Sequence, residues 1–277
     1  MVYNIEYAYT SNIGKVRKNH EDNFWCDGDF LPAVNSGMEG VTSGIIKAEE
    51  IPAFAVFDGM GGESCGEMAA AAAAEAFDTY YQDNRKDFAD DPRMFLLELG
   101  KYMNSRVCGY ASDHNIISMG STAASVLFGR DWYAASNLGD SRIYVCRKGK
   151  LEQVSTDHVF MGGNFRKAPL VQYLGLEESD GVLEPSFVRG NLEEGLRILL
   201  CSDGVTDMIT DEELCKMLSA EEGIAEITGA VLEKALENGG RDNTTLILLQ
   251  AVPGEENAKE GFFSRLFGSF FGGRKSS

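Results

Sequence analysis

The sequence predicts an α+β fold in which short antiparallel strands are covered by paired helices. Short runs rich in β-branched and aromatic residues alternate with turns that contain glycine, which is typical of strands. Longer segments carry apolar residues at helical spacing. An alanine-rich helical segment at 64–81 favours close packing against a flat surface, so we expect helices to lie on sheets.

The first half of the chain contains two predicted strands and a predicted helix pair. The strands lie at residues 5–10 and 53–57, and the helices at 64–81 and 93–112. We expect the two helices to pair in antiparallel orientation. Residues 26–52 lack periodicity and are predicted to form a loop.

After Ser121 the apolar period becomes that of strands. Four short runs, at 122–128, 132–138, 142–147 and 151–154, predict an antiparallel meander. Residues 156–173 are irregular, and a loop of this length is usually functional or mobile.

The last third of the chain returns to a mixture of strands and helices. We expect a buried strand at 196–201, helices at 210–218 and 224–238, and a final strand at 244–252. Thr210 and Glu213 are spaced as a capping box at the start of the first of these helices.

Charge and cysteine usage exclude several classes of protein. The 277 residues include 43 acidic and 25 basic side chains, so a net charge of −18 disfavours nucleic acid and anionic lipid as partners. No apolar run approaches the ~20 residues that span a bilayer, and residues 1–10 do not resemble a signal peptide. The six scattered cysteines are typical of reduced thiols. We therefore expect a cytoplasmic protein.

Four aspartates lie at the ends or starts of predicted buried strands, each beside glycine or a small polar residue. They are Asp58, Asp140, Asp203 and Asp242. Each of these aspartates with its neighbouring residues, which we call a corner, is by itself most simply an ordinary turn. Several converging carboxylates, however, would repel one another unless cations lay between them. With only three histidines in the chain, the ligands would be mainly oxygen atoms, and Mg²⁺ or Mn²⁺ would fit.

A charged segment at 14–24 leaves two interpretations open. It could be a solvated loop, as most runs of mixed charge are. Alternatively, Arg17 could bind an anion while Glu21 and Asp22 reach a cation, since the planar guanidinium of arginine matches a phosphate bidentately.

An ordered set of motifs resembles the bacterial form of the metal-dependent serine/threonine protein phosphatases of type 2C. The motifs are RKNHED (17–22), DGMGG (58–62), GST (120–122), GDSR (139–142), SDG (202–204) and RDNTT (241–245). The resemblance covers about residues 3–252. It implies a β-sandwich of two mostly antiparallel sheets flanked on both faces by antiparallel helix pairs. We expect a catalytic domain at 1–253 and a separate tail at 254–277.

The resemblance also implies the roles of individual residues. Asp58 would bridge two metal ions, and the carbonyl of Gly59 would be a further ligand. Asp22, Asp203 and Asp242 would bind the ions directly or through water, and Glu21 would hold a water of the centre. Asp140, with Asp203, would bind a third and weaker metal. Arg17 would grip the substrate phosphate, which makes Arg17 and Asp58 the candidate catalytic residues.

The implied activity is hydrolysis of phosphoserine and phosphothreonine in proteins, in opposition to a serine/threonine kinase. A water shared by two manganese or magnesium ions would attack phosphorus without a covalent enzyme intermediate. Two departures and an aromatic C-terminal tail motivate an alternative, a pseudophosphatase or regulatory binding module that docks partners through this tail. Met60 stands where some members have a proton-donating histidine, and the flap at 158–174 is shorter than usual. Intact metal-type residues argue against that alternative.

The tail differs in composition from the rest of the chain. After a polar spacer at 254–260, six aromatic or aliphatic residues are spaced to share one face of a short helix. The apolar face could dock onto a partner, fold back onto the core or lie in a membrane interface. Glycines 268, 272 and 273 and the small number of cations make membrane binding the least favoured of the three.

Overall fold

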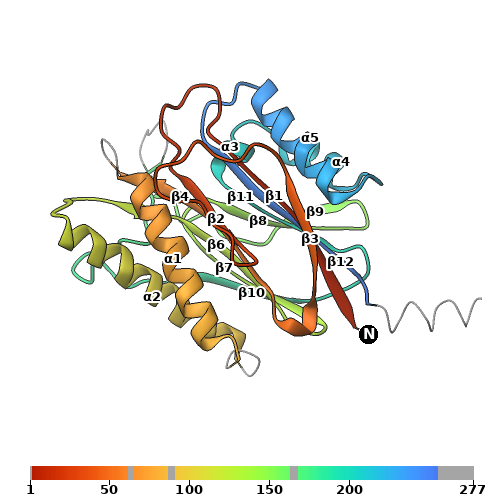
Figure 1. Cartoon of the computed structure of the whole chain (residues 1–277), viewed down its shortest axis with the longest axis horizontal. Helices are drawn as coiled ribbons and strands as arrows, with labels where there is room; N and C mark the ends of the chain where they lie inside the picture. The colour runs from red at the N-terminus through yellow and green to blue at the C-terminus, as the bar shows by residue number, and fades with distance from the viewer. Residues whose placement is uncertain (1, 62–64, 87–90, 163–167, 255–277) are drawn as a thin grey trace, which may run out of the picture.

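The computed structural model describes residues 2–61, 65–86, 91–162 and 168–254, and these form four layers: helices, sheet, sheet and helices (Figure 1). The α+β sandwich predicted from the sequence is thereby confirmed. Within the described residues, no helix is long and apolar enough to cross a membrane. All of the predicted tail except Gly254 lies outside the described residues, so its boundary stays a prediction.

The first sheet has six strands in the order β3-β1-β12-β11-β8-β9. Neighbouring strands are antiparallel throughout. Its strands are β1 (Tyr3–Asn12), β3 (Thr42–Lys47), β8 (Arg142–Arg147), β9 (Lys150–Gln153), β11 (Arg197–Cys201) and β12 (Thr244–Pro253).

The second sheet has the order β10-β7-β6-β4-β2, and a short strand, β5, pairs with the end of β4. It too is antiparallel. Its strands are β2 (Asp22–Cys26), β4 (Ala53–Met60), β5 (Gly120–Ser121), β6 (Ala123–Phe128), β7 (Trp132–Leu138) and β10 (Ser186–Asn191).

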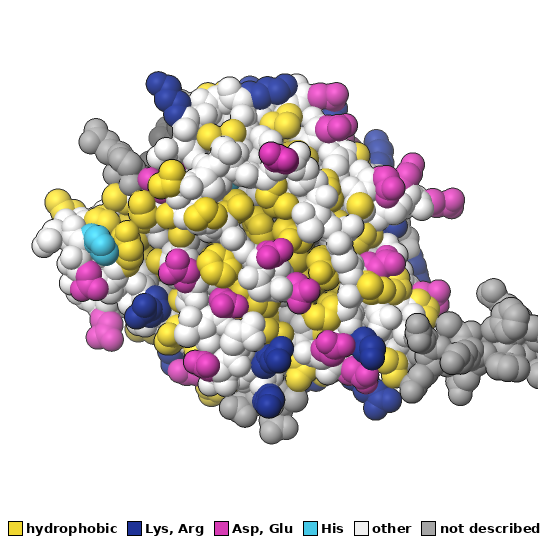
Figure 2. Space-filling model, in the orientation of Figure 1, with side chains coloured by type: hydrophobic (Ala, Val, Ile, Leu, Met, Phe, Trp, Pro, Cys, Tyr) yellow, Lys and Arg dark blue, Asp and Glu magenta, His cyan; other side chains and the backbone are white. Residues whose placement is uncertain are grey.

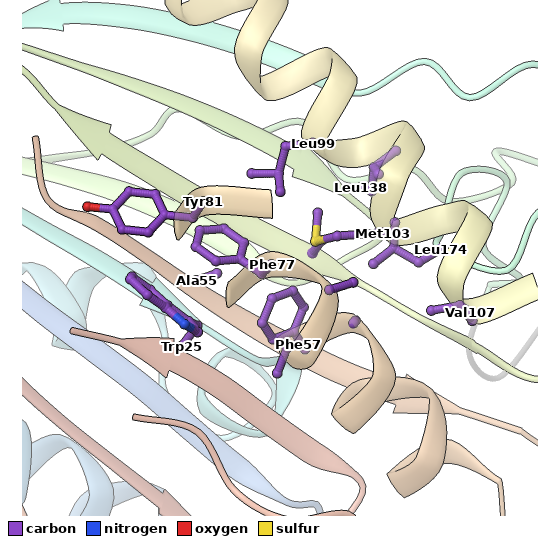
Figure 3. Packing of buried hydrophobic residues seen from close by; sticks show 14 of the residues in the cluster. Trp25, Ala55, Phe57, Phe77, Tyr81, Leu99, Met103, Val107, Leu138 and Leu174 are labelled. Atoms are coloured by element: carbon purple, nitrogen blue, oxygen red, sulfur yellow. The ribbon is translucent and has the colours of Figure 1, made fainter. Parts of the chain in front are cut away.

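Helices α1 (Gly66–Asn84) and α2 (Pro92–Asp113) cover the second sheet as an antiparallel pair. The start of one meets the end of the other: the Tyr80 and Phe95 rings are 5.4 Å apart, and Tyr110 donates to the Met68 sulfur. Small residues on α1, including Ala69, let the helix approach the sheet closely. Figure 3 shows the aromatic and aliphatic side chains that fill the remaining space.

The outer face of the first sheet carries the other three helices, α3 (Asp203–Thr206), α4 (Asp211–Leu218) and α5 (Ile224–Glu237). Helix α4 begins with the predicted capping box, in which Thr210 and Glu213 each bind the backbone N–H of the other. A third cluster of buried side chains lies between the two sheets. Each interface between layers is therefore apolar.

Residues 26–52 do not form the single loop that the sequence predicts. They contain β3 and a short 3₁₀ helix at Ala48–Glu50. Most of β3 is exposed, and Gly44 interrupts its apolar pattern, so local propensity is weak. Pairing with β1 stabilises the strand, because the Tyr7 ring lies over Gly44.

The predicted meander is wrong in one respect. Its four strands exist, but β6 and β7 form one hairpin in the second sheet, and β8 and β9 form another in the first. The chain changes sheet between Leu138 and Arg142. Because β6, β7 and β8 are buried on both faces for most of their length, their apolar pattern does not indicate which sheet each joins.

Candidate metal centre

The predicted site residues lie at one end of the sandwich, where strands of both sheets begin or end. Asp22 begins β2, and Asp58 and Gly59 lie near the end of β4. Asp140 occupies the turn after β7, Asp203 follows β11 as the first residue of α3, and Asp242 precedes β12. Antiparallel pairing brings these ends together, since each strand that arrives at this edge lies beside one that leaves it.

Three of the carboxylates form a compact cluster. One carboxylate oxygen from each of Asp58, Asp140 and Asp203 lies within 4.8 Å of the other two. Asp203 is buried, and the other two are half-buried. Three negative charges at such separations in a partly desolvated place repel strongly unless a cation lies between them.

Asp22 adds a fourth carboxylate next to this cluster. It is paired in register with Asp58 on the neighbouring strand and is only 3% exposed. Its Oδ2 accepts a hydrogen bond from Ser202. Burial raises the pKa of Asp22, and the negative charges of Asp203 and Asp242 raise it further, although hydrogen bonds from Ser202 and Thr245 lower it. Like charges directly opposite on two strands are destabilising, which again indicates a site made for cations.

Two tight contacts hold the Asp58 and Asp140 corners in place. The Asp58 N–H donates to Thr122 Oγ1, and the Thr122 N–H donates to the Asp58 carbonyl. Gly139, next to Asp140, has a φ of 99°, and a Cβ there would lie 2.5 Å from Thr122 Cγ2. Thr122 therefore fixes both corners, and the second one requires glycine.

Gly59 lies where the end of β4 meets the start of α1. A Cβ at Gly59 would lie 2.0 Å from the Gly66 carbonyl oxygen and 2.6 Å from the Glu21 carbonyl oxygen. The Gly59 N–H donates to that same Glu21 carbonyl. Only glycine fits, and the chain from Glu21 to Asp22 is thereby attached to the Asp58 corner.

Glu21 is half-buried, with its carboxyl group close to Gly66 at the first turn of α1. Burial raises the pKa of Glu21, the nearby Glu67 raises it further, and Arg17 opposes both. Its main-chain N–H donates to the side chain of Asn243. The structure thus places Glu21 beside Asp22, although not within the compact cluster.

Arg17 forms an ion pair with Asp242. This hydrogen-bonded pair raises the pKa of Arg17, and Arg17 keeps its charge. The Arg17 side chain is 48% exposed, so part of the guanidinium faces solvent at the edge of the site. Asp242 is also outside the compact cluster, but its charge acts on Asp22.

Sequence reasoning did not identify the polar residues that support the carboxylates. Asn243 accepts from the Glu21 N–H and donates to the carbonyls of Ile13 and Asn19, and it is 3% exposed. Ser202 accepts from the Thr245 N–H while it donates to Asp22. Asn243 belongs to the motif RDNTT and Ser202 to the motif SDG. Each lies next to a strand-end aspartate in the sequence, and that position could have indicated a supporting role.

His20, near Arg17 in sequence, does not lie on the surface. It is 2% exposed, and its Nε2 is 3.1 Å from the Ser11 hydroxyl. Burial lowers the pKa of His20 to about 4. The imidazole is a neutral core group, whereas Lys18, two residues before it, is exposed.

The donor set of this centre fits divalent cations. It consists of hard carboxylate oxygens from Asp58, Asp140 and Asp203, with a main-chain carbonyl at hand. Met60 contributes no oxygen ligand, and the end of its side chain lies against Gly120.

Comparisons with known proteins agree with this geometry. The family model described as protein phosphatase 2C matches residues 43–239. The serine/threonine protein phosphatase PstP of Mycobacterium tuberculosis (strain CDC 1551 / Oshkosh) is 27% identical over 267 residues, which are 90% of this chain and 45% of PstP. The serine/threonine phosphatase stp of Listeria welshimeri serovar 6b is 25% identical over 258 residues, covering 87% of this chain and 94% of stp. The chain thus spans less than half the length of PstP and nearly all of stp.

A solved structure is similar over the whole sandwich. The catalytic domain of PstP in complex with two manganese ions has a TM-score of 0.70 and 27% identity, and the match covers 90% of this chain and 100% of that domain. The family match includes three of the strand-end aspartates, Asp58, Asp140 and Asp203. The motifs, the layers and the family model agree, and the chain belongs to the protein phosphatase 2C family.

Proposed function

We propose that this chain is a metal-dependent phosphatase that hydrolyses phosphoserine and phosphothreonine in proteins. The observation that carries the proposal is the convergence of Asp58, Asp140 and Asp203 within 4.8 Å at the edge between two sheets. Family membership and the manganese-containing PstP domain support the same activity.

The proposed ligands divide between the two sheets. Asp58, with the Gly59 carbonyl and Asp22, would hold cations from the second sheet. Asp203, Asp242 and the corner residue Asp140 would complete the set, and Asp140 with Asp203 would form a weaker third position. Manganese or magnesium bound there would neutralise the phosphate and lower the pKa of water towards neutrality.

The remaining groups of the chain position the substrate. Arg17 offers its exposed guanidinium edge to the phosphoryl oxygens, while Asp242 fixes the orientation of the side chain. Glu21 is held at its main chain by Asn243 and Gly59, so its carboxyl group can accept a hydrogen bond from a water molecule at a constant position. Direct attack by water, with no covalent enzyme intermediate, completes the proposal.

The alternative, a pseudophosphatase that serves as a binding module, is not favoured. All the acidic residues expected of a metal centre are present, and their arrangement brings three of them together. Met60 removes one candidate proton donor, but its packing against Gly120 leaves the carboxylates in place.

The test is a phosphatase assay with manganese on an aryl phosphate and on a phosphoserine peptide. We expect Asp58→Asn and Asp203→Asn to reduce kcat/KM by at least about a hundredfold, because each removes a charge from the cation site. Asp131→Asn, an exposed aspartate in the β6–β7 turn at the opposite end of the second sheet, is the matched control. Equal rates for the folded wild-type protein and Asp58→Asn would overturn the proposal.

Three finer expectations belong to the same proposal. The substrates would be phosphorylated proteins, and the enzyme would oppose a serine/threonine kinase. The tail beyond residue 254 would dock a partner or the enzyme's own core, and a cytoplasmic location would fit both roles.

A further inference from the structure

The edge of the metal centre beside Arg17 is positively charged, unlike the protein as a whole. The chain as a whole has a charge of −18, yet the loops at 14–19 and 239–241 together contain Lys15, Arg17, Lys18 and Arg241, all of them exposed. Figure 2 shows cations at the upper edge of the molecule, where Figure 1 places the β1–β2 loop and the C-terminal end of α5. We call Lys15, Lys18 and Arg241 the cationic rim.

The two loops that carry the rim are joined to each other. The Lys15 N–H donates to the Gly240 carbonyl at 2.7 Å. A Cβ at Gly240 would lie 3.2 Å from Lys15 Cγ, and one at Gly239 would lie 3.5 Å from Arg241 Cγ. The aliphatic parts of Lys15 and Arg241 therefore lie along the same two-glycine turn, and both side chains are exposed there.

The rim is also fixed relative to the site. Asn243 binds the carbonyls at both ends of the loop, those of Ile13 and Asn19. Arg17, between Lys15 and Lys18, is paired with Asp242. In the described part of the chain the three rim cations have no ion pair of their own, so their charge is available to a ligand that approaches Arg17.

We propose that the cationic rim selects phosphopeptides with acidic residues next to the phosphorylated residue. This inference rests on the proposed phosphatase function. A phosphate held by Arg17 at the metal centre would bring the flanking residues of its peptide across the rim, where aspartate or glutamate would pair with Lys15, Lys18 or Arg241. Without these cations the net negative charge of the protein would disfavour such peptides.

The test compares two phosphoserine peptides of equal length, one with aspartates on both sides of the phosphoserine and one with asparagines. We expect the wild-type enzyme to show about three- to tenfold higher kcat/KM on the acidic peptide, in keeping with a few exposed ion pairs. This preference should fall as salt is raised towards 0.5 M. An aryl phosphate, too small to reach the rim, should show neither effect.

The double variant Lys15→Glu, Arg241→Glu should lose the preference and keep its aryl phosphatase rate within about twofold. The control variant Arg130→Glu, Lys150→Glu changes the net charge equally. It places one change in the β6–β7 turn and the other at the first residue of β9, both at the end of the sandwich away from the site, so it should retain the preference. If the double variant fails to fold, Lys18→Glu tests the same surface. Equal rates on the two peptides, or an equal loss in the control variant, would overturn the inference.

The same experiment separates failure of the inference from failure of the proposed function. If manganese supports no hydrolysis of the aryl phosphate or of either peptide, the proposed function fails. Fluorescence anisotropy of the labelled acidic and neutral phosphopeptides then tests the rim by itself. Tighter binding of the acidic peptide to the wild type than to the double variant would support the rim, and equal binding would refute it.

Discussion

Asn243 acts on the loop that carries Arg17 and Glu21 by satisfying three main-chain groups at once. Its side chain binds the N–H of Glu21 and the carbonyls of Ile13 and Asn19 while being only 3% exposed. Buried main-chain groups that lose their partners cost free energy, so this one amide helps to hold both ends of the loop.

Asn243→Ala should lower the free energy of unfolding by about 1–3 kcal/mol, because it leaves buried polar groups without partners. It should also raise KM more than it lowers kcat, since Arg17 loses its fixed position. Urea unfolding and steady-state kinetics measure the two effects. The control Asn238→Ala removes an exposed asparagine whose side chain donates to the Met208 carbonyl, and it should change KM little. An unchanged KM in Asn243→Ala would contradict this role.

At the scale of the elements, the alanines of α1 pack against the sheet, whereas Gly109 of α2 is exposed to solvent. On α1 the alanines face β2 and β4, and larger side chains there would overpack the interface. On α2, Gly109 is exposed, and a Cβ there would have no heavy atom within 4 Å. That glycine serves no packing purpose and weakens its helix.

Gly109→Ala should therefore raise the free energy of unfolding by about 0.5–1 kcal/mol without changing activity. Chemical denaturation followed by circular dichroism measures the gain. Gly28→Ala is the matched control: its Cβ would also meet nothing, but φ is 90°, so the same substitution should destabilise. Destabilisation by Gly109→Ala would show that the end of α2 is not helical in solution.

At the scale of the molecule, the metal centre joins the two sheets. Asp58 belongs to the second sheet, Asp203 follows a strand of the first, and Asp140 occupies the turn where the chain passes between them. Repulsion between these three carboxylates destabilises this end of the sandwich when no cation is bound. Bound cations would make the contribution of the carboxylates to stability favourable.

Manganese should consequently raise the Tm of the wild-type protein, with a stabilisation of about 2.7 kcal/mol when the free metal is a hundred times Kd. In a chelator, Asp58→Asn should be at least as stable as the wild type, because one repelling carboxylate is gone. With manganese the order should reverse. Differential scanning calorimetry in both conditions tests this, with Asp131→Asn as the variant expected to follow the wild type. A Tm of the wild type that is indifferent to manganese would contradict a cation site.

The sequence by itself determined the helices, most strands and the acidic residues at strand ends, because these depend on local patterns of apolar spacing, glycine and charge. Strands β2, β3, β5 and β10 were not predicted, and they and the sheet to which β7 and β8 belong were decided by pairing between segments far apart in the chain. The same holds within the site. The motifs name Asp58, Asp140 and Asp203, but only tertiary packing brings their oxygens within 4.8 Å, buries His20 and turns Asn243 towards the Arg17 loop. The distance between side chains on different strands depends on the register of the strands and on the sheet to which each strand belongs. Neither can be predicted from a local sequence pattern.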